Sequence, residues 1–154
     1  MSRAMFYHLT RRPVERALPP LLSRARGAGM RILLRARRAE TLSHLDELLW
    51  LEPEDGFLAH GLDGAGHEAA QPILLTTGHA RPNGAECLIA IEGAEAPPEE
   101  AAALERACIL FNGNDAGELA QARAQWRALI GAGLGAEYWS EESGRWQKKQ
   151  ESGG

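Results

Sequence analysis

The sequence predicts an α/β fold: a single three-layer domain with a mostly parallel central sheet. Short apolar runs alternate along the chain with longer stretches in which apolar residues recur every three or four positions. The first pattern is typical of buried strands and the second of amphipathic helices. Their alternation favours parallel strands joined by helical crossovers. The length of 154 residues suits one domain.

The chain opens with a strand and a helix. Residues 5–9 (MFYHL) predict a strand, and residues 12–26 follow with their apolar side chains on one helical face. Pro13 suits the first turn of that helix, because the N–H that a proline lacks has no partner there. Pro19 and Pro20 interrupt the pattern, so the helix either kinks at this point or starts later.

A second strand and a second helix continue the alternation. Residues 31–35 (RILLR) predict a buried strand, and residues 39–50 (AETLSHLDELLW) an amphipathic helix that Pro53 ends. Residues 51–71 contain several glycines and scattered acids, which is typical of a loop. Within this loop, residues 57–62 could add a short extended piece.

Three more apolar runs predict strands. They lie at residues 72–76 (PILLT), 86–91 (ECLIAI) and 106–111 (RACILF). A short helix is expected after Pro97 and Pro98, where a proline fits the first helical turn. These elements extend the same sheet and keep the α/β pattern.

The most regular helix pattern covers residues 115–130. Asp115 is followed by Glu118 three residues later, which fits a capping box. Residues 137–140 and 145–147 flank a polar turn and predict a small β-hairpin. The domain is therefore expected to cover residues 1–147, with a disordered tail at residues 148–154.

Composition narrows the class of protein. The chain is 44% hydrophobic and 25% charged, as in an ordinary globular protein. No apolar run approaches the roughly 18 residues of a membrane span, and residues 1–16 carry no signal-peptide core. We therefore expect a cytoplasmic protein with no membrane partner. Cys87 and Cys108 lie in apolar runs and are expected to be reduced core thiols.

Charge is distributed unevenly along the chain. Residues 1–38 hold ten arginines and one acid, whereas most of the 21 acids follow later. A basic segment of this kind could bind nucleic acid directly. Its arginines also fit the solvated ends of a helix and strands, and the acidic remainder would repel phosphate. Nucleic acid is therefore expected only as an indirect partner.

The usual phosphate-binding signals of a Rossmann-like fold are missing. Residues 111–117 (FNGNDAG) join a strand to a helix, but they lack both the lysine of a P-loop and the glycine spacing of a dinucleotide site. Asp115 would also repel a phosphate at that helix N-terminus. Residues 8–13 (HLTRRP), after the first strand, contain no glycine that would let a pyrophosphate approach.

Metal and catalytic motifs are equally weak. His60, Asp63 and His67 could bind zinc, but a polar loop surface is the expected reading of these residues. No serine lies in a nucleophile elbow, and neither cysteine has a neighbouring histidine. We therefore expect no cofactor, no metal and no catalysis by the isolated chain.

Two groups of aromatic and charged residues carry a resemblance to a known family. One is the helix end at residues 45–50 (LDELLW) followed by residues 57–60 (FLAH). The other is the segment at residues 123–127 (RAQWR), which an Ala-Gly turn follows. Together with the opening Phe-Tyr strand, this order resembles the chi subunit of the bacterial DNA polymerase III holoenzyme over residues 5–146. Chi is an accessory subunit of the clamp loader.

The resemblance implies a replisome adaptor with a Rossmann-like fold and no phosphate-binding loop. It implies binding of the acidic C-terminal tail of single-stranded DNA-binding protein. It also implies binding of the psi subunit or an equivalent clamp-loader partner and, as in some members of the family, of a helicase. The implied tail site consists of Asn112, Arg123, Trp126, Arg127 and Ile130. The implied site for psi or a helicase consists of Trp50 and Phe57.

The residue types of the last helix suit an acidic peptide that ends in an aromatic residue. Arg123 and Arg127 are four positions apart and share a helix face, so either could hold a terminal carboxylate through paired hydrogen bonds. Trp126 and Ile130 could wall the pocket, although Leu119 stands where relatives commonly carry a basic residue. The alternative is that the tryptophan is core and the two arginines are a solvated edge.

Two other functions stay open. The first is a nucleotide- or phosphate-binding enzyme of Rossmann-like fold that has lost the usual loop, which protection against heat by added nucleotide would support. The second is a direct nucleic-acid binder that uses the Arg-rich N-terminal third. Strongly salt-dependent binding to naked single strands would support it.

Overall fold

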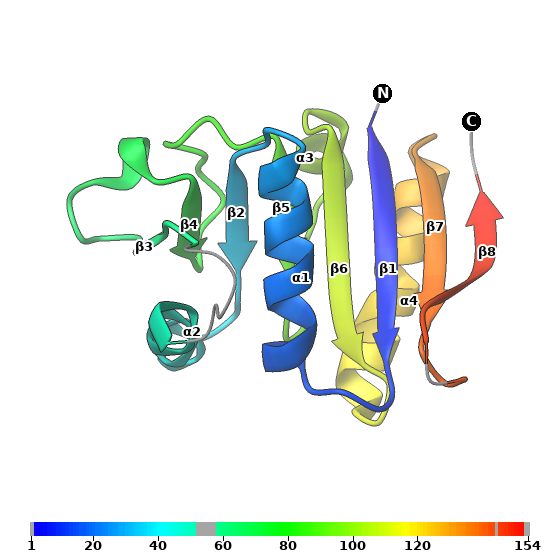
Figure 1. Ribbon diagram of the computed structural model, residues 1–154. Coiled ribbons are helices and arrows are strands. Elements are labelled where there is room, and N and C mark those ends of the chain that lie inside the picture. Colours follow the sequence, from blue (N-terminus) through cyan, green and yellow to red (C-terminus); the bar gives the residue numbers. More distant parts are fainter. Residues whose placement is uncertain (1, 52–57, 144, 153–154) are drawn as a thin grey trace.

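The computed structural model describes every residue except 1, 52–57, 144 and 153–154 (Figure 1). Strands and helices alternate along most of the chain, as the sequence predicts. In chain order the elements are β1 (Arg3–Leu9), α1 (Val14–Gly27), β2 (Ile32–Arg35), α2 (Ala39–Leu51), β3 (Gly61–Leu62), a 3₁₀ turn (Glu68–Ala70), β4 (Ile73–Thr76), β5 (Cys87–Ala90), α3 (Pro98–Ala102), β6 (Arg106–Asn112), α4 (Ala116–Gly131), β7 (Gly135–Ser140) and β8 (Gln147–Ser152).

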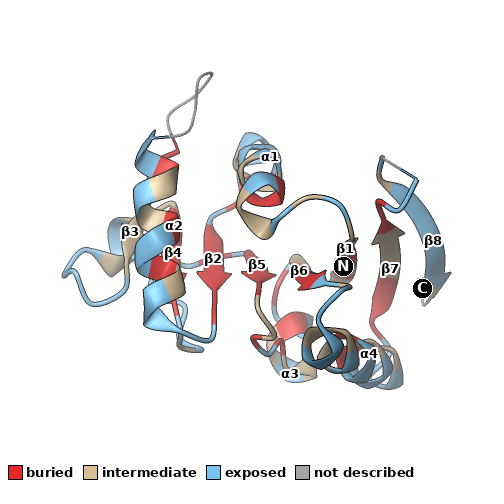
Figure 2. Cartoon of the chain, turned by 90° about the horizontal axis from the view of Figure 1, so that it is seen from below, coloured by how far each residue is buried: buried red, intermediate tan, exposed pale blue. Residues whose placement is uncertain are grey.

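The described strands form one sheet in the order β3-β4-β2-β5-β6-β1-β7-β8. Neighbouring strands are parallel, except for the antiparallel pair β7–β8. Helices α1 and α2 cover one face of the sheet, and α3 and α4 cover the other (Figure 2). The predicted three-layer α/β fold with a mostly parallel sheet is therefore confirmed.

Each face of the sheet has its own apolar core. Ile32 and Leu34 of β2 pack in the cluster that includes α1 and α2, whereas Leu33 between them packs in the cluster that includes α3 and α4. Side chains alternate between faces along a strand. Central strands covered on both faces therefore appear in the sequence as continuous apolar runs. Cys87 and Cys108 are buried free thiols in this core, as predicted.

Helix α1 runs through both of its internal prolines. It begins at Val14, with Pro13 as its N-cap, so the alternative of a later start at Pro19–Pro20 is wrong. A proline in a helix interior costs about 3 kcal/mol. Leu18 and Leu22 on this helix are at most 1% exposed, and their burial offsets that cost. None of the described helices has the length and apolar character that crossing a membrane requires.

The C-terminal segment corrects one expectation and confirms another. The predicted hairpin is present as β7 and β8, and β8 begins at Gln147. Residues 148–152, expected to be disordered, form most of β8 instead. β7 pairs with β1 on one side. Residues 147–152 form a strand because their backbone groups pair with those on the other side of β7. Residues 153–154 lie outside the described residues.

Candidate functional site

A cavity of about 250 Å³ opens between α4 and the end of the sheet where β6, β7 and β8 contribute side chains. Its lining joins residues that lie far apart in the sequence. The lining residues are Leu119, Ala122, Arg123, Trp126 and Arg127 on α4, Phe111 on β6, Tyr138 on β7 and Gln150 on β8.

Aromatic rings form the inner part of this cavity. Trp126 packs edge-on against Phe6 of the core, with ring centroids 5.3 Å apart. The Trp126 ring also lies 6.1 Å from the Tyr138 ring, and the Tyr138 ring lies 6.0 Å from that of Phe111. Such pairs contribute about 0.5–1.5 kcal/mol each beyond their burial. Trp126 therefore serves both expected roles, since it packs on the core and lines the cavity.

His8 contacts two of these aromatic residues, Phe111 and Tyr138. It stacks on Phe111 at 4.9 Å, and its Nδ1 shares a hydrogen bond of 2.6 Å with the Tyr138 hydroxyl. A Cβ at Gly113 would meet His8 Nε2 at 1.8 Å, so only glycine fits beside the ring. Burial lowers the pKa of His8 from its ordinary value, Arg123 lowers it further, and nearby glutamates only partly oppose them. The neutral ring therefore supports the Tyr138 side of the cavity.

Arg123 and Arg127 stand at the cavity, one helical turn apart and exposed. Within the described part of the chain, no carboxylate pairs with either guanidinium. Both charges are therefore available to a ligand. An apolar cavity beside two available guanidinium groups can hold an apolar side chain and an adjacent carboxylate at once.

The structure brings together three of the five residues expected at the tail site. Arg123, Trp126 and Arg127 line the cavity. Asn112 does not, because its side-chain oxygen accepts a hydrogen bond from the Asn114 N–H in the turn before α4. Ile130 does not either, because it packs against the core under α4.

Sequence reasoning missed Phe111, Ala122, Tyr138 and Gln150, and it named Leu119 only as a departure from relatives. Leu119 and Ala122 carried a local signal, since both lie on the apolar face of the predicted helix. Phe111, Tyr138 and Gln150 come from three different strands. Only the order of those strands in the sheet brings them to one cavity, and no local pattern encodes that order.

The second expected site lies at the end of α2. Trp50 is 52% exposed and Leu51 83% exposed, and both are large apolar side chains. Trp50 lies against His60, with ring centroids 4.4 Å apart. Phe57, the other residue expected here, lies outside the described residues. The tryptophan therefore stands at the surface and does not close the core.

His60 corrects the expectation of a polar loop surface. It is 4% exposed, with Nδ1 2.6 Å from the Leu58 carbonyl and Nε2 3.2 Å from the Asp46 carbonyl. Asp63 accepts a hydrogen bond of 2.7 Å from the Thr76 hydroxyl. Both residues therefore hold the loop onto the domain, while Asp63 and His67 are exposed as expected.

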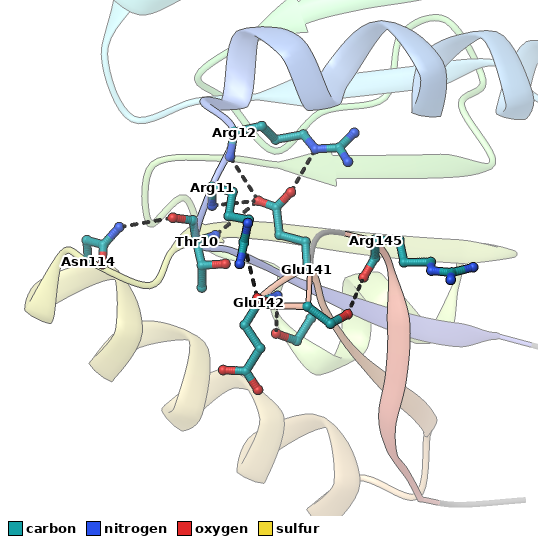
Figure 3. Close-up of polar contacts among 9 residues, drawn as sticks. Thr10, Arg11, Arg12, Asn114, Glu141, Glu142 and Arg145 are labelled. Atoms are coloured by element: carbon teal, nitrogen blue, oxygen red, sulfur yellow. Dashed lines mark hydrogen bonds and ion pairs between the residues drawn. The ribbon is translucent and has the colours of Figure 1, made fainter.

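The turn between β1 and α1 contains an internal carboxylate where a Rossmann-like fold would bind phosphate (Figure 3). Glu141 is 1% exposed and accepts hydrogen bonds of 3.0–3.1 Å from the backbone N–H groups of Thr10, Arg11 and Arg12. Its other oxygen pairs with Arg12 Nε at 2.7 Å. Burial by itself would raise the pKa of Glu141. The hydrogen bonds to the carboxylate have the larger effect, so the pKa lies below its ordinary value.

Acidic side chains also accept backbone N–H groups at two other helix starts, which likewise follow the ends of parallel strands. At α2, Glu92 accepts hydrogen bonds of 2.9 and 2.8 Å from the N–H groups of Arg37 and Arg38. At α4, Asp115 accepts from the N–H of Glu118 at 3.0 Å. A helix N-terminus favours an anion, and in all three places the chain supplies its own. This filling argues against the alternative of a nucleotide-binding enzyme.

Comparison with known proteins identifies a family for the chain. Among curated proteins, none matches the chain. A family model described as "DNA polymerase III chi subunit, HolC" matches residues 1–137. The matched region includes all of α4 and its two arginines. Since this match covers well over half of its length, the chain belongs to the chi subunit family of DNA polymerase III.

Proposed function

We propose that the chain is a non-catalytic replisome adaptor that binds the acidic C-terminal tail of single-stranded DNA-binding protein and links it to the clamp loader. Family membership supports the accessory role in DNA polymerase III. The tail is proposed to bind in the cavity beside α4. The observation that carries this proposal is the pairing of that cavity with Arg123 and Arg127.

The cavity suits a peptide end better than a free small molecule. Its volume of about 250 Å³ lies below the roughly 300–1,000 Å³ of typical small-molecule sites, and it fits one aromatic side chain. A carboxylate at the peptide's end would reach Arg123 or Arg127. The remaining acids of the tail would gain from the same local positive charge, although the chain as a whole carries a net charge of −4.

The test is a titration of a labelled peptide that copies the acidic C-terminus of the host's single-stranded DNA-binding protein. We expect a Kd in the micromolar range, or about −8 kcal/mol. Arg127→Ala removes a charged hydrogen-bond donor worth about 1.5–3 kcal/mol, and Trp126→Ala removes a wall. Both variants should weaken binding at least tenfold.

Arg16→Ala is the matched control. Arg16 is an exposed arginine on α1, on the face of the sheet opposite to α4 (Figure 2). Arg16→Ala changes the net charge as much as Arg127→Ala does, and Arg16 does not line the cavity. If Arg127→Ala and Arg16→Ala weaken binding equally, the effect is one of net charge and the proposed site is wrong. If the wild-type chain does not bind at low salt, the proposed function itself is wrong.

The surface at the end of α2 supports a second contact, with psi or an equivalent clamp-loader partner, or with a helicase. Exposed Trp50 and Leu51 are the observation in its favour, since tryptophan is a frequent anchor in protein interfaces. Trp50→Ala should abolish capture of the partner and leave tail binding unchanged. Loss of both interactions together would indicate a folding defect and not a second site.

A further inference from the structure

The β7–β8 hairpin forms one wall of the cavity, and most of it lies beyond the family match. The match ends at residue 137, whereas the wall consists of Tyr138 and Gln150. These two residues are direct partners across the hairpin. Their side chains therefore point to the same face of the sheet, which is the face that α4 covers.

A bulge in the hairpin determines which side chain of β8 faces the cavity. Trp139 is opposite Lys148, but Tyr138 is opposite Gln150, so Lys149 is the extra residue. In a regular ladder Lys149 would stand opposite Tyr138. Bulges commonly redirect a side chain beside a functional site. Here the bulge replaces a lysine with a neutral amide at the cavity.

The hairpin is fixed to β1 at both of its ends. At one end, Arg3 pairs with Glu137 of β7 at 2.6 Å and with Glu151 of β8 at 2.9 Å. At the other end, Glu141 accepts the N–H groups of the β1–α1 turn, and the Glu142 carbonyl accepts from Arg11 Nε at 3.1 Å (Figure 3). The wall is therefore held in place before any ligand arrives.

The Gln150 side chain has unused hydrogen-bonding capacity. It is exposed, and among the described residues its amide group makes no hydrogen bond. An amide both donates and accepts, so it matches a peptide bond better than it matches a carboxylate. Arg123 and Arg127, across the cavity on α4, match the carboxylate instead.

We propose that Gln150 is a ligand-contact residue that hydrogen-bonds the backbone of the bound acidic peptide, just before the residue whose side chain fills the cavity. This inference rests on the proposed function and extends it. The arginines of α4 hold the peptide's charge, and the hairpin recognises its extended backbone. The hairpin thereby selects a peptide end over a free aromatic acid.

The test uses the full chain and the same labelled peptide, with substitutions at two glutamines of β8. Gln150→Ala should weaken binding between about two- and twelvefold, the loss expected for one neutral hydrogen bond. Gln150→Glu keeps the size of the side chain but adds a charge that repels the acidic peptide. It should weaken binding about fivefold or more at low salt, and less at high salt.

Gln147→Ala and Gln147→Glu are the matched controls, because Gln147 is exposed on the same strand and does not line the cavity. They should change the Kd less than twofold. Equal effects at Gln147 and Gln150, with Arg127→Ala still reducing binding, would overturn this inference and leave the proposed function standing. Absence of binding by the wild-type chain would overturn both.

Discussion

Replacing Glu141 with alanine should destabilise the domain strongly, because one buried carboxylate serves four donors. The backbone N–H groups of Thr10, Arg11 and Arg12 all point to it, and Arg12 Nε pairs with it. Breaking a buried ion pair costs about 3–5 kcal/mol. The Arg12 side chain is 35% exposed and can regain water, so we expect a loss near the lower end, about 3 kcal/mol.

A milder substitution at position 141 removes the negative charge of the side chain and keeps its shape. Glu141→Gln keeps the side-chain length and one accepting oxygen, so it should lose about 1.5–3 kcal/mol, the contribution of one charged hydrogen bond. The net pKa of Glu141 is lowered from its ordinary 4.5. Its ionised form therefore stabilises the fold fully above pH 4.5 and progressively less as pH falls through the lowered value. The difference in the free energy of unfolding between the wild-type chain and Glu141→Gln should shrink below pH 4.5.

The assay is urea unfolding followed by circular dichroism, with the midpoint compared at unchanged slope. Glu142→Gln is the control, since the neighbouring Glu142 side chain is 65% exposed and its variant should stay within about 0.5 kcal/mol of wild type. A loss below about 0.5 kcal/mol for Glu141→Ala would refute the reasoning. A gap that does not change between neutral and acidic pH would refute it as well.

Three further predictions concern stability and use the same unfolding assay. Glu100→Ala should cost about 3–5 kcal/mol, because it strands the buried Arg35 guanidinium, whereas exposed Glu99→Ala should cost less than about 0.5 kcal/mol. Gln125→Ala should cost about 1–3 kcal/mol, because it leaves the Ala96 N–H and the Ala94 carbonyl without their buried partner; a smaller loss would mean that water replaces the amide. Because the pKa of His8 is lowered in the folded chain, His8 is protonated at a higher pH in the unfolded chain than in the folded one. The free energy of unfolding should therefore fall as pH drops below 6.5. His8→Gln should make the free energy of unfolding less dependent on pH in this range. An unchanged pH dependence would mean that His8 does not cause it.

Local sequence patterns were sufficient for most of the secondary structure. Helix α4 begins where the cap predicts, and Asp115 accepts from the Glu118 N–H at 3.0 Å. The return bond of a capping box is absent, because the Glu118 carboxylate accepts from the Asn112 N–H instead. The spacing of Arg123 and Arg127 also predicted correctly that both would stand together, since a helix places residues four apart on one face.

The C-terminal strand was not predictable in the same way. Residues 147–152 are all polar, and 147–151 are exposed, so they carry none of the apolar alternation that indicates a strand. Their strand conformation depends on backbone pairing with β7 and on ion pairs such as Arg3 with Glu151. Both are contacts with distant parts of the chain.

The sequence by itself determined the α/β class, the extent of most elements, and the face of α4 that carries the two arginines. These follow from local periodicity and caps, which act over a few residues. Only the tertiary structure decided the walls of the cavity and the role of Glu141, which appears in the sequence as one loop acid among many. His8 meets Tyr138 across 130 residues of sequence, and the Glu141 carboxylate reaches Arg12 across 129. Such contacts depend on β1 pairing with both β6 and β7, and strand order is a property of the whole packed sheet.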